Sequence, residues 1–221
     1  MVPHRPPTAS GPRSFRALLP YQALEMSFPK NIAPLDLFRR WFEEATAADI
    51  PLANAASLAT ADASGRPSAR MVLLKGWGDE GFAFYTNLGS QKAREIDENP
   101  QASLLVHWKE LGRQIRISGA VQPISDEEAD AYFATRDRKS KIGAWASRQS
   151  HPFPSGENLA IRVARAGARF GLEDIPRPTF WGGYRVIPDR MEFWSEGRFR
   201  LHTRRLYVRE GSNWTSVALQ P

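Results

Sequence analysis

The order of hydrophobic and polar positions along this chain predicts one amphipathic helix followed by a series of short strands. Phe38, Trp41 and Ala45 recur at helical spacing, and the helix that they predict covers residues 34–48. Further along, short apolar runs alternate with polar turns, which is typical of strands joined by tight links. The predicted strands cover residues 55–61, 68–75, 82–87, 102–108, 114–121, 184–186, 190–194, 204–209 and 214–219.

Three further helices are predicted among these strands. The first, over residues 90–98, ends before Pro100, because proline blocks continuation of a helix. Ser125 and Glu128 have the spacing of a capping box and open the second helix. The third covers residues 157–170. Since successive strands are joined by short polar links, the pattern indicates an antiparallel meander or barrel with peripheral helices rather than a parallel sheet.

Length and composition indicate a single domain preceded by an arm. Of the 221 residues, 42% are hydrophobic and 11% aromatic, which is enough for a packed core. Residues 1–32 carry six prolines and little periodicity, so we expect a flexible arm there and one domain over residues 33–221. There is no long apolar run and no charged-then-apolar start, so we expect a cytoplasmic protein.

Charge and residue usage narrow the chemistry. The net charge of +6 is compatible with nucleic acid, an anionic membrane or small phosphorylated ligands as partners. The absence of consecutive basic blocks argues against nucleic acid. No cysteine is present, which excludes disulfides and thiol chemistry, and the four histidines are scattered, which argues against a histidine-rich metal site. The sequence also lacks the common hydrolase, metalloprotease and nucleotide-loop motifs.

Two clusters place cations at the ends of predicted elements. Arg70 and Lys75 bracket four apolar residues of one predicted strand, a pattern that ordinary solvated strand ends also explain. Residues 87–94 run from a strand through a Gly-Ser turn into a helix. Backbone N–H groups at that helix start, with Lys92 beside them, would suit a phosphate, although a plain helix cap has the same pattern.

A third cluster near the C-terminus is more specific. Arg200, His202 and Arg204 alternate, so they would share one face if this segment were extended. Two guanidinium groups beside an imidazole repel one another unless an anion lies between them. Structural packing rarely calls for such an arrangement, so the cluster favours a functional site.

Taken together, and in this order, these clusters resemble the pyridoxine 5′-phosphate oxidase family. The resemblance extends from about residue 34 to the C-terminus. The matching segments are R-M-V-L-L-K (70–75), F-Y-T-N-L-G-S-Q-K (84–92), S-L-L-V-H-W (103–108), R-Q-I-R-I-S-G (113–119), Y-F-A-T-R (132–136), S-K-I-G-A-W-A-S-R-Q-S (140–150), F-W-G-G-Y (180–184), E-F-W (192–194) and R-L-H-T-R (200–204).

The resemblance implies a fold, an assembly and a reaction. The family fold is mainly β with helices (α+β), an antiparallel, Greek-key-like split β-barrel that binds FMN. The resemblance further implies a homodimer with two FMN sites between the subunits, formed in part by a C-terminal dimerisation and active-site segment, and no nucleic-acid or membrane partner. The implied reaction oxidises pyridoxamine or pyridoxine 5′-phosphate to pyridoxal 5′-phosphate. Hydride passes from the substrate C4′ carbon to the flavin, and O2 reoxidises the flavin to give H2O2.

Site residues follow from the resemblance position by position. Arg70 and Lys92 would hold the FMN phosphate, and Arg200 and His202 would lie over the substrate ring as the catalytic pair. The substrate phosphate would be bound by Lys75, Tyr132, Arg136 and Ser140. Tyr132 and Arg136 are four residues apart on the predicted helix, so they would share one of its faces. The remaining cofactor residues would be Met71, Val72, Leu73, Leu74, Lys75, Tyr85, Thr86, Gln91, Gln114, Gln149, Ser150, Trp194 and Arg204.

Two departures from the family pattern keep other functions open. Thr203 stands where the family usually has an acid, and Gln91 where a second cation often precedes the lysine. A related flavin oxidase of the phenazine-biosynthesis type would share the fold but act on a ring outside the B6 group. A flavin or pyridoxal-phosphate binding module without catalysis is the second alternative, and Thr203 favours it. A nucleic-acid binding protein is the third and rests on charge alone; its binding would depend steeply on salt.

Overall fold

The computed structural model describes Phe28 and residues 32–221, so most of the predicted arm over residues 1–32 lies outside the described residues. In this part of the chain, helices and strands follow the predicted order closely. The helices are α1 (Pro34–Ala47), α2 (Gln91–Glu98), α3 (Asp126–Ala134), α4 (Arg138–Ala146) and α5 (Leu159–Phe170). The strands are β1 (Ala55–Ala61), β2 (Pro67–Leu73), β3 (Gly76–Gly78), β4 (Gly81–Asn87), β5 (Gln101–Trp108), β6 (Arg113–Pro123), β7 (Trp181–Ser195), β8 (Thr203–Glu210) and β9 (Asn213–Leu219).

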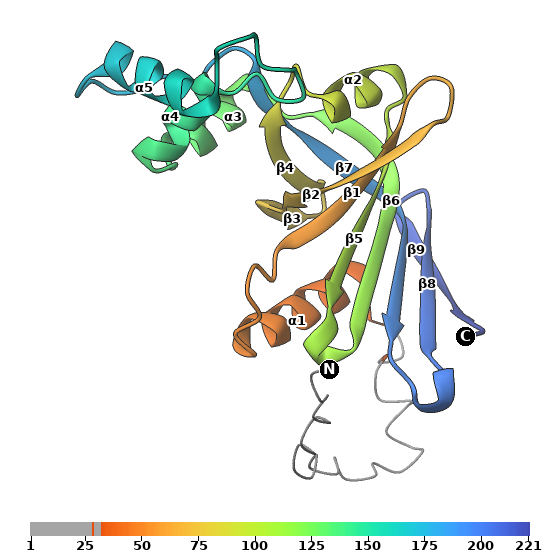
Figure 1. Cartoon of the computed structure of the whole chain (residues 1–221). Coiled ribbons are helices and arrows are strands. Elements are labelled where there is room, and N and C mark those ends of the chain that lie inside the picture. Colours follow the sequence, from red (N-terminus) through yellow and green to blue (C-terminus); the bar gives the residue numbers. More distant parts are fainter. Residues whose placement is uncertain (1–27, 29–31) are drawn as a thin grey trace, which may run out of the picture.

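All nine strands belong to one curved antiparallel sheet. The strands lie in the order β2-β1-β5-β6-β7-β4-β3, and β8 and β9 extend the sheet from β7. Figure 1 shows that the sheet curls around α1, while α3, α4 and α5 gather at its far end. The prediction of an antiparallel barrel with peripheral helices is therefore confirmed. None of the helices described here is long and apolar enough to cross a membrane.

Strand β7 connects the two parts of the sheet, because the strand that pairs with one of its edges changes halfway along it. One of its edges pairs with β6 from Tyr184 to Ser195, while the other pairs first with β4 and then with β8. The change comes at Pro188, which has no N–H to donate. Opposite it, a β-bulge at Gly119 brings the two backbones so close that a Cβ on Gly119 would lie 1.9 Å from the Ile187 carbonyl oxygen.

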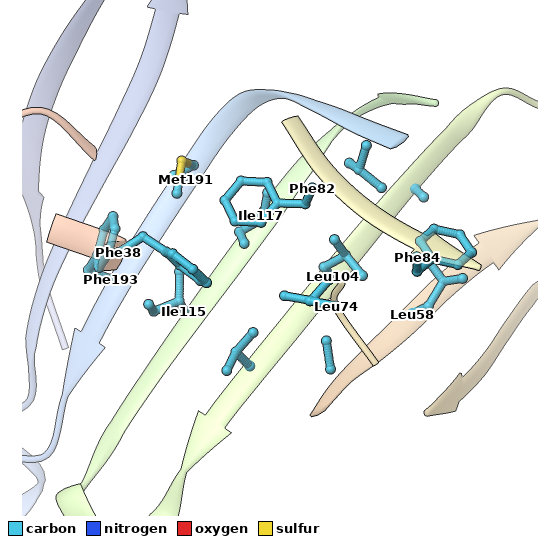
Figure 2. Packing of buried hydrophobic residues seen from close by; sticks show 14 of the residues in the cluster. Phe38, Leu58, Leu74, Phe82, Phe84, Leu104, Ile115, Ile117, Met191 and Phe193 are labelled. Atoms are coloured by element: carbon cyan, nitrogen blue, oxygen red, sulfur yellow. The ribbon is translucent and has the colours of Figure 1, made fainter. Parts of the chain in front are cut away.

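The core fills the concave side of the sheet. Phe38 and Trp41 of α1 are buried, with the Phe38 ring 4.9 Å from that of Phe82 and the Trp41 ring 5.3 Å from that of Phe193. Figure 2 shows Met191 and Phe193 of β7 together with labelled side chains from β4, β5 and β6. Because aromatic rings bury a large apolar area each, α1 is an integral part of the barrel.

Two elements were not predicted. No helix was predicted at residues 138–146, where the structure has α4. Asp137 caps this helix, accepting a hydrogen bond from the Ser140 N–H at 2.9 Å, so the aspartate three residues ahead of a serine was the available signal. The short β3 lies in the link between the predicted strands at residues 68–75 and 82–87. The two strands predicted at 184–186 and 190–194 are one continuous strand, and the gap between them coincides with Pro188.

Candidate functional site

The buried ammonium group of Lys92 is the centre of the first group of candidate residues, the Lys92 cluster (Arg70, Thr86, Ser90, Lys92, Glu95 and Gln149). Lys92 is only 6% exposed. Its Nζ donates to Thr86 Oγ1 at 2.9 Å, Ser90 Oγ at 3.2 Å and Gln149 Oε1 at 2.9 Å, all neutral acceptors. Burial, together with the nearby charge of Arg70, lowers the pKa of Lys92 to about 8.

Arg70 is held beside Lys92 by a buried carboxylate. Its Nη2 lies 3.1 Å from Glu95 Oε2, and its guanidinium also donates to the hydroxyls of Ser68 and Thr60. Burial alone would raise the pKa of Glu95, but hydrogen bonds from these hydroxyls, Gln91 and Arg70 outweigh it and lower that pKa to about 2. Glu95 therefore stays ionised and fixes the position of the arginine.

The Lys92 cluster fits a phosphate group. It contains two cations and one carboxylate, and it lies at the start of α2, where Ser90 makes no side-chain cap. Uncapped N–H groups at a helix start attract anions, and guanidinium and ammonium groups are the usual partners of phosphate. A buried lysine that meets only neutral acceptors among the described residues would be stabilised by such an anion.

The second group, the Trp181 cluster (Tyr85, Tyr132, Phe133, Arg136 and Trp181), lies where β4 and β7 meet α3. The rings of Tyr85 and Tyr132 stack at 4.0 Å, and Trp181 lies parallel to Tyr85 at 5.4 Å. The Tyr85 hydroxyl donates to Glu128 Oε1 at 3.3 Å. Tyr85, predicted to line the flavin, thus has its ring packed against a residue predicted to bind substrate.

Arg136 is the most informative residue of the Trp181 cluster. Its guanidinium lies over the Trp181 ring at 4.9 Å and over the Phe133 ring at 5.4 Å. Its Nη1 is buried and has no hydrogen-bond partner within the described residues. Burial lowers the pKa of Arg136. A buried guanidinium N–H without a partner is costly, so this site favours an anionic ligand.

One expectation about Arg136 needs correction. Tyr132 and Arg136 were expected to share a helix face, but α3 ends at Ala134 and the Arg136 N–H donates to the Phe133 carbonyl in a tight turn. The two side chains are brought together because both lie against Trp181, with the Tyr132 ring 6.2 Å from it. Trp181 belongs to the quoted F-W-G-G-Y segment but was assigned no role.

The third group is a row of side chains across three strands, the Trp194 row (Gln114, Trp194 and Arg204). Gln114 of β6 lies opposite Trp194 of β7, which lies opposite Arg204 of β8. Arg204 pairs with the buried Glu192, with Nη2 2.8 Å from Oε1, and Arg116 binds the other carboxylate oxygen. The positive charge of Arg204 is thus balanced within the chain. Glu192 supplies the carboxylate, although Thr203 stands where the family usually has an acid.

The segment before β8 is not extended, which corrects the expectation that Arg200, His202 and Arg204 share one face. Residues Arg198–Arg200 form a 3-10 turn, and Phe199 and Arg200 have left-handed φ values of +55° and +65°. The His202 ring instead packs on Trp194 at 4.7 Å, and its Nδ1 accepts a hydrogen bond from the Gly197 N–H at 3.2 Å. Arg200 is exposed at the tip of this loop.

These groups lie at opposite ends of β7. The Trp181 cluster meets the first residue of the strand, whereas His202 packs on Trp194, thirteen positions later. At a strand rise of about 3.3 Å per residue, this is roughly 40 Å of strand. Figure 1 shows α3 and α4 at one end of β7 and the connection to β8 at the other. One chain therefore holds these two groups far apart.

The other predicted cofactor and substrate residues differ in how accessible their side chains are to a ligand. Met71, Leu73 and Lys75 are exposed on and after β2. Leu74 is the least accessible of these residues: its side chain is 1% exposed in the core, and both its backbone groups bond to Asn54. Val72 is half-buried and packs against the core. Two polar residues already have hydrogen-bond partners: Gln91 donates to Glu95 Oε1 at 2.7 Å, and Ser140 donates to Asp137 Oδ2 at 2.6 Å. Ser150 is exposed with a φ of +67°.

Two buried acids that were not predicted as site residues, Glu95 and Glu192, hold predicted arginines in place. Glu192 stands between two buried apolar residues of a strand, and an acid there needs a cationic partner. That pattern was the signal available. Glu95, in the short polar helix α2, gives no comparable signal. In the part of the chain that the structure describes, no group of three or more His, Asp or Glu side chains could hold a metal ion.

Comparison with known families finds two matches. Residues 42–170 match the family described as pyridoxamine 5′-phosphate oxidase. Residues 181–221 match the pyridoxine 5′-phosphate oxidase C-terminal dimerisation region. The second match begins at the first residue of β7 and includes Trp194 and Arg204 of the Trp194 row.

Curated relatives agree with these matches. The pyridoxine/pyridoxamine 5′-phosphate oxidase of Rubrobacter xylanophilus is 56% identical over 188 residues, which cover 85% of this chain and 87% of that protein. The protein of the same name from Sphingopyxis alaskensis is 54% identical with the same coverage.

Solved structures show the same fold. PhzG from Burkholderia lata, in complex with tetrahydrophenazine-1-carboxylic acid, has a TM-score of 0.82 and 35% identity, covering 95% of this chain and all of that one. A pyridoxamine 5′-phosphate oxidase-related, FMN-binding protein from Nostoc punctiforme has a TM-score of 0.68 at 18% identity and covers 86% of this chain and 99% of that one.

Proposed function

Because the chain belongs to the pyridoxine/pyridoxamine 5′-phosphate oxidase family, we propose that it oxidises both pyridoxine and pyridoxamine 5′-phosphate to pyridoxal 5′-phosphate with O2 as the electron acceptor. The alcohol substrate and O2 give the aldehyde and H2O2. The amine substrate, O2 and water give the aldehyde, ammonia and H2O2. The protein is an oxidoreductase, and FMN is its cofactor.

The observation that carries the proposal is the unpaired Arg136. A buried guanidinium nitrogen without a partner, over the face of Trp181, is suited to a ligand that combines a phosphate with a flat ring. Tyr132 and Lys75 would add a hydroxyl and a second cation to this phosphate site. Ser140 would join them only by turning its hydroxyl away from Asp137.

The Lys92 cluster and the Trp194 row are the parts we assign to FMN. Arg70 and Lys92 would hold its phosphate, with Gln149 and Thr86 already bonded around the ammonium group. Trp194, Gln114 and Arg204 would border the ring system from one face of the sheet. When bound, FMN supplies the acceptor for two electrons and passes them to O2.

The enzyme is a homodimer, since residues 181–221 match the C-terminal dimerisation region of the family. We propose that each of its two sites combines the Lys92 and Trp181 clusters of one chain with the Trp194 row and the loop at residues 197–202 of the other. The length of β7 supports this division, because it holds the two halves of one chain far apart.

Arg200 and His202 would act on the substrate ring. Arg200, exposed on a fixed turn, would place a positive charge beside the ring and so orient it. The Nδ1 atom of His202 accepts the Gly197 N–H, so a neutral imidazole carries its proton on Nε2. His202 would therefore donate a hydrogen bond to the substituent on C4′ and position it, in preference to removing a proton from it.

A phenazine-type reaction is the main alternative. PhzG shares 35% identity with this chain, whereas the relatives named for B6 phosphates share 54–56%. The unpaired Arg136 further supports a phosphorylated substrate. We therefore retain the B6 assignment.

The test of this function is a peroxide assay on the purified protein together with identification of its chromophore. We expect a yellow protein that releases FMN on denaturation and forms H2O2 with pyridoxine or pyridoxamine 5′-phosphate. Release of FAD, or a folded protein without flavin, would refute the cofactor assignment. Bound FMN without peroxide formation would favour the non-catalytic binding module.

Binding of FMN should weaken as the pH rises through about 8, because burial lowers the pKa of Lys92 to about 8. Below this pH Lys92 is protonated and contributes its full charge to the phosphate site; above it, binding must first restore the proton. Titration of flavin fluorescence over a pH series measures the affinity. Lys92→Arg is the matched control, since guanidinium stays charged throughout and should abolish the pH dependence. Equal pH profiles for both proteins would contradict the assignment.

A further inference from the structure

Phe199 lies in the loop between β7 and β8 with its side chain 91% exposed. The next exposed apolar side chain in this loop is Leu201, at 61%. Between them, Arg200 is one of the two residues we assign to the substrate ring. A phenyl ring that projects into solvent beside a substrate-binding arginine needs an explanation in terms of what it contacts.

The loop is fixed in this shape despite an unfavourable backbone. Phe199 and Arg200 both have left-handed φ values, which residues other than glycine rarely adopt. The Leu201 N–H donates to the Arg198 carbonyl at 3.0 Å, and His202 accepts the Gly197 N–H. At Gly197 a Cβ would lie 1.8 Å from the Leu201 carbonyl oxygen, so only glycine fits. Strain kept in a well-bonded loop is typical of functional positions.

We propose that Phe199 packs against the partner subunit at the rim of its substrate site and excludes water beside Arg200 and His202. This inference rests on the proposed function for the identity of that site. The ring cannot reach the Trp181 cluster of its own chain, because β7 separates them by roughly 40 Å of strand. The loop also lies within the segment that matches the dimerisation region, so a second copy is the partner that the chain itself supplies.

Each copy of the chain offers a suitable apolar surface. Met71 is 65% exposed and Leu73 is 36% exposed, and both precede the exposed cation Lys75. Both belong to β2, the strand that also carries Arg70 of the Lys92 cluster. A phenyl ring placed there would bury apolar area and leave the adjacent Arg200 in a drier surrounding, where its charge acts more strongly on the substrate.

The chain has no cysteine, so a single introduced thiol reports the environment of residue 199 without interference. In the FMN-loaded dimer of Phe199→Cys, we expect the thiol to react with a maleimide severalfold more slowly than a freely exposed thiol, and more slowly still with pyridoxal 5′-phosphate bound. Leu52→Cys is the matched control: Leu52 is 66% exposed, also has a left-handed φ of +52°, and lies in the turn between α1 and β1. Equal labelling rates at the two positions would overturn the proposal.

A second pair of variants separates the side chain from the backbone strain. Glycine accepts a left-handed φ freely, so Phe199→Gly and Leu52→Gly both relieve strain and should fold at least as stably as the parent protein. If the ring contacts the partner's site, Phe199→Gly should lower flavin-normalised kcat/KM about tenfold while Leu52→Gly leaves it unchanged. Full activity of Phe199→Gly would refute the role.

The labelling experiment also distinguishes failure of this inference from failure of the proposed function. It needs only a folded dimer and does not depend on turnover. If the parent protein forms no peroxide yet the thiol at position 199 is protected in the dimer, the contact stands and the reaction assignment falls. If the parent protein is active and the thiol reacts as fast as the control, the reaction assignment stands and the contact falls.

Discussion

Replacement of Arg136 by leucine should lower kcat/KM for pyridoxine 5′-phosphate about 100-fold while FMN remains bound. The guanidinium is half-buried over Trp181 with one nitrogen unpaired, so the phosphate of the substrate is the group that would complete its hydrogen bonds. Leucine keeps an apolar contact with the ring but removes the charge. Since the arginine has an unsatisfied buried group, the variant should be at least as stable as the parent protein.

Steady-state kinetics with two substrates measures this effect. The loss should appear with the phosphorylated substrate and largely disappear with unphosphorylated pyridoxine, because the arginine then has no phosphate to bind. Lys139→Leu serves as the control, since Lys139 is an exposed cation close by in the chain. An equal loss with both substrates would show that Arg136 supports the fold of the site rather than the phosphate.

Mixing two inactive variants should restore activity, which is the second large effect that we expect. Arg200→Leu alone should keep FMN but sharply lower turnover per bound flavin, because a positioning charge acts mainly in the transition state. In a heterodimer of Arg136→Leu with Arg200→Leu chains, one of the two sites receives both intact arginines and the other receives neither. Random association of equal amounts should give about one quarter of the parent activity.

Denaturation and joint refolding of the two variants, followed by the peroxide assay, tests this complementation. The control is a chain carrying both substitutions mixed with Arg136→Leu, which leaves no site with both arginines. Activity at the level of the separate variants would mean that Arg136 and Arg200 act within one chain. That outcome would contradict the division of the site that we infer from the length of β7.

The antiparallel barrel could be predicted because its strands carry strong local signals. Predicted and observed helices agree closely for α1, α2 and α5, and the capping serine of α3 is where the spacing placed it. What could not be read was the continuity of β7. Pro188 looks like a break, and only the tertiary structure shows that the strand continues while its partner changes from β4 to β8.

The site was less predictable than the fold. The resemblance named Arg70, Lys92 and Arg136, and the structure gives each a chemically suitable place. The extended conformation predicted around Arg200 was wrong. The alternating pattern of Arg200, His202 and Arg204 does not reveal a left-handed turn that depends on a close contact at Gly197. The roles of the buried acids also escaped detection, since a carboxylate such as Glu95 is recognised only through the partners that distant parts of the chain bring to it.

Strand β7 also limits how a protein of this design can change in evolution. The first residue of β7, Trp181, lies under Arg136, and Trp194 is the last residue but one of the same strand. In the proposed dimer, one strand therefore sets the spacing of two half-sites. Loss or gain of one residue within it would turn every following side chain to the opposite face of the sheet. Insertions are therefore tolerable in surface connections such as residues 152–156, whereas between Trp181 and Trp194 a change in length would disable both reaction centres at once.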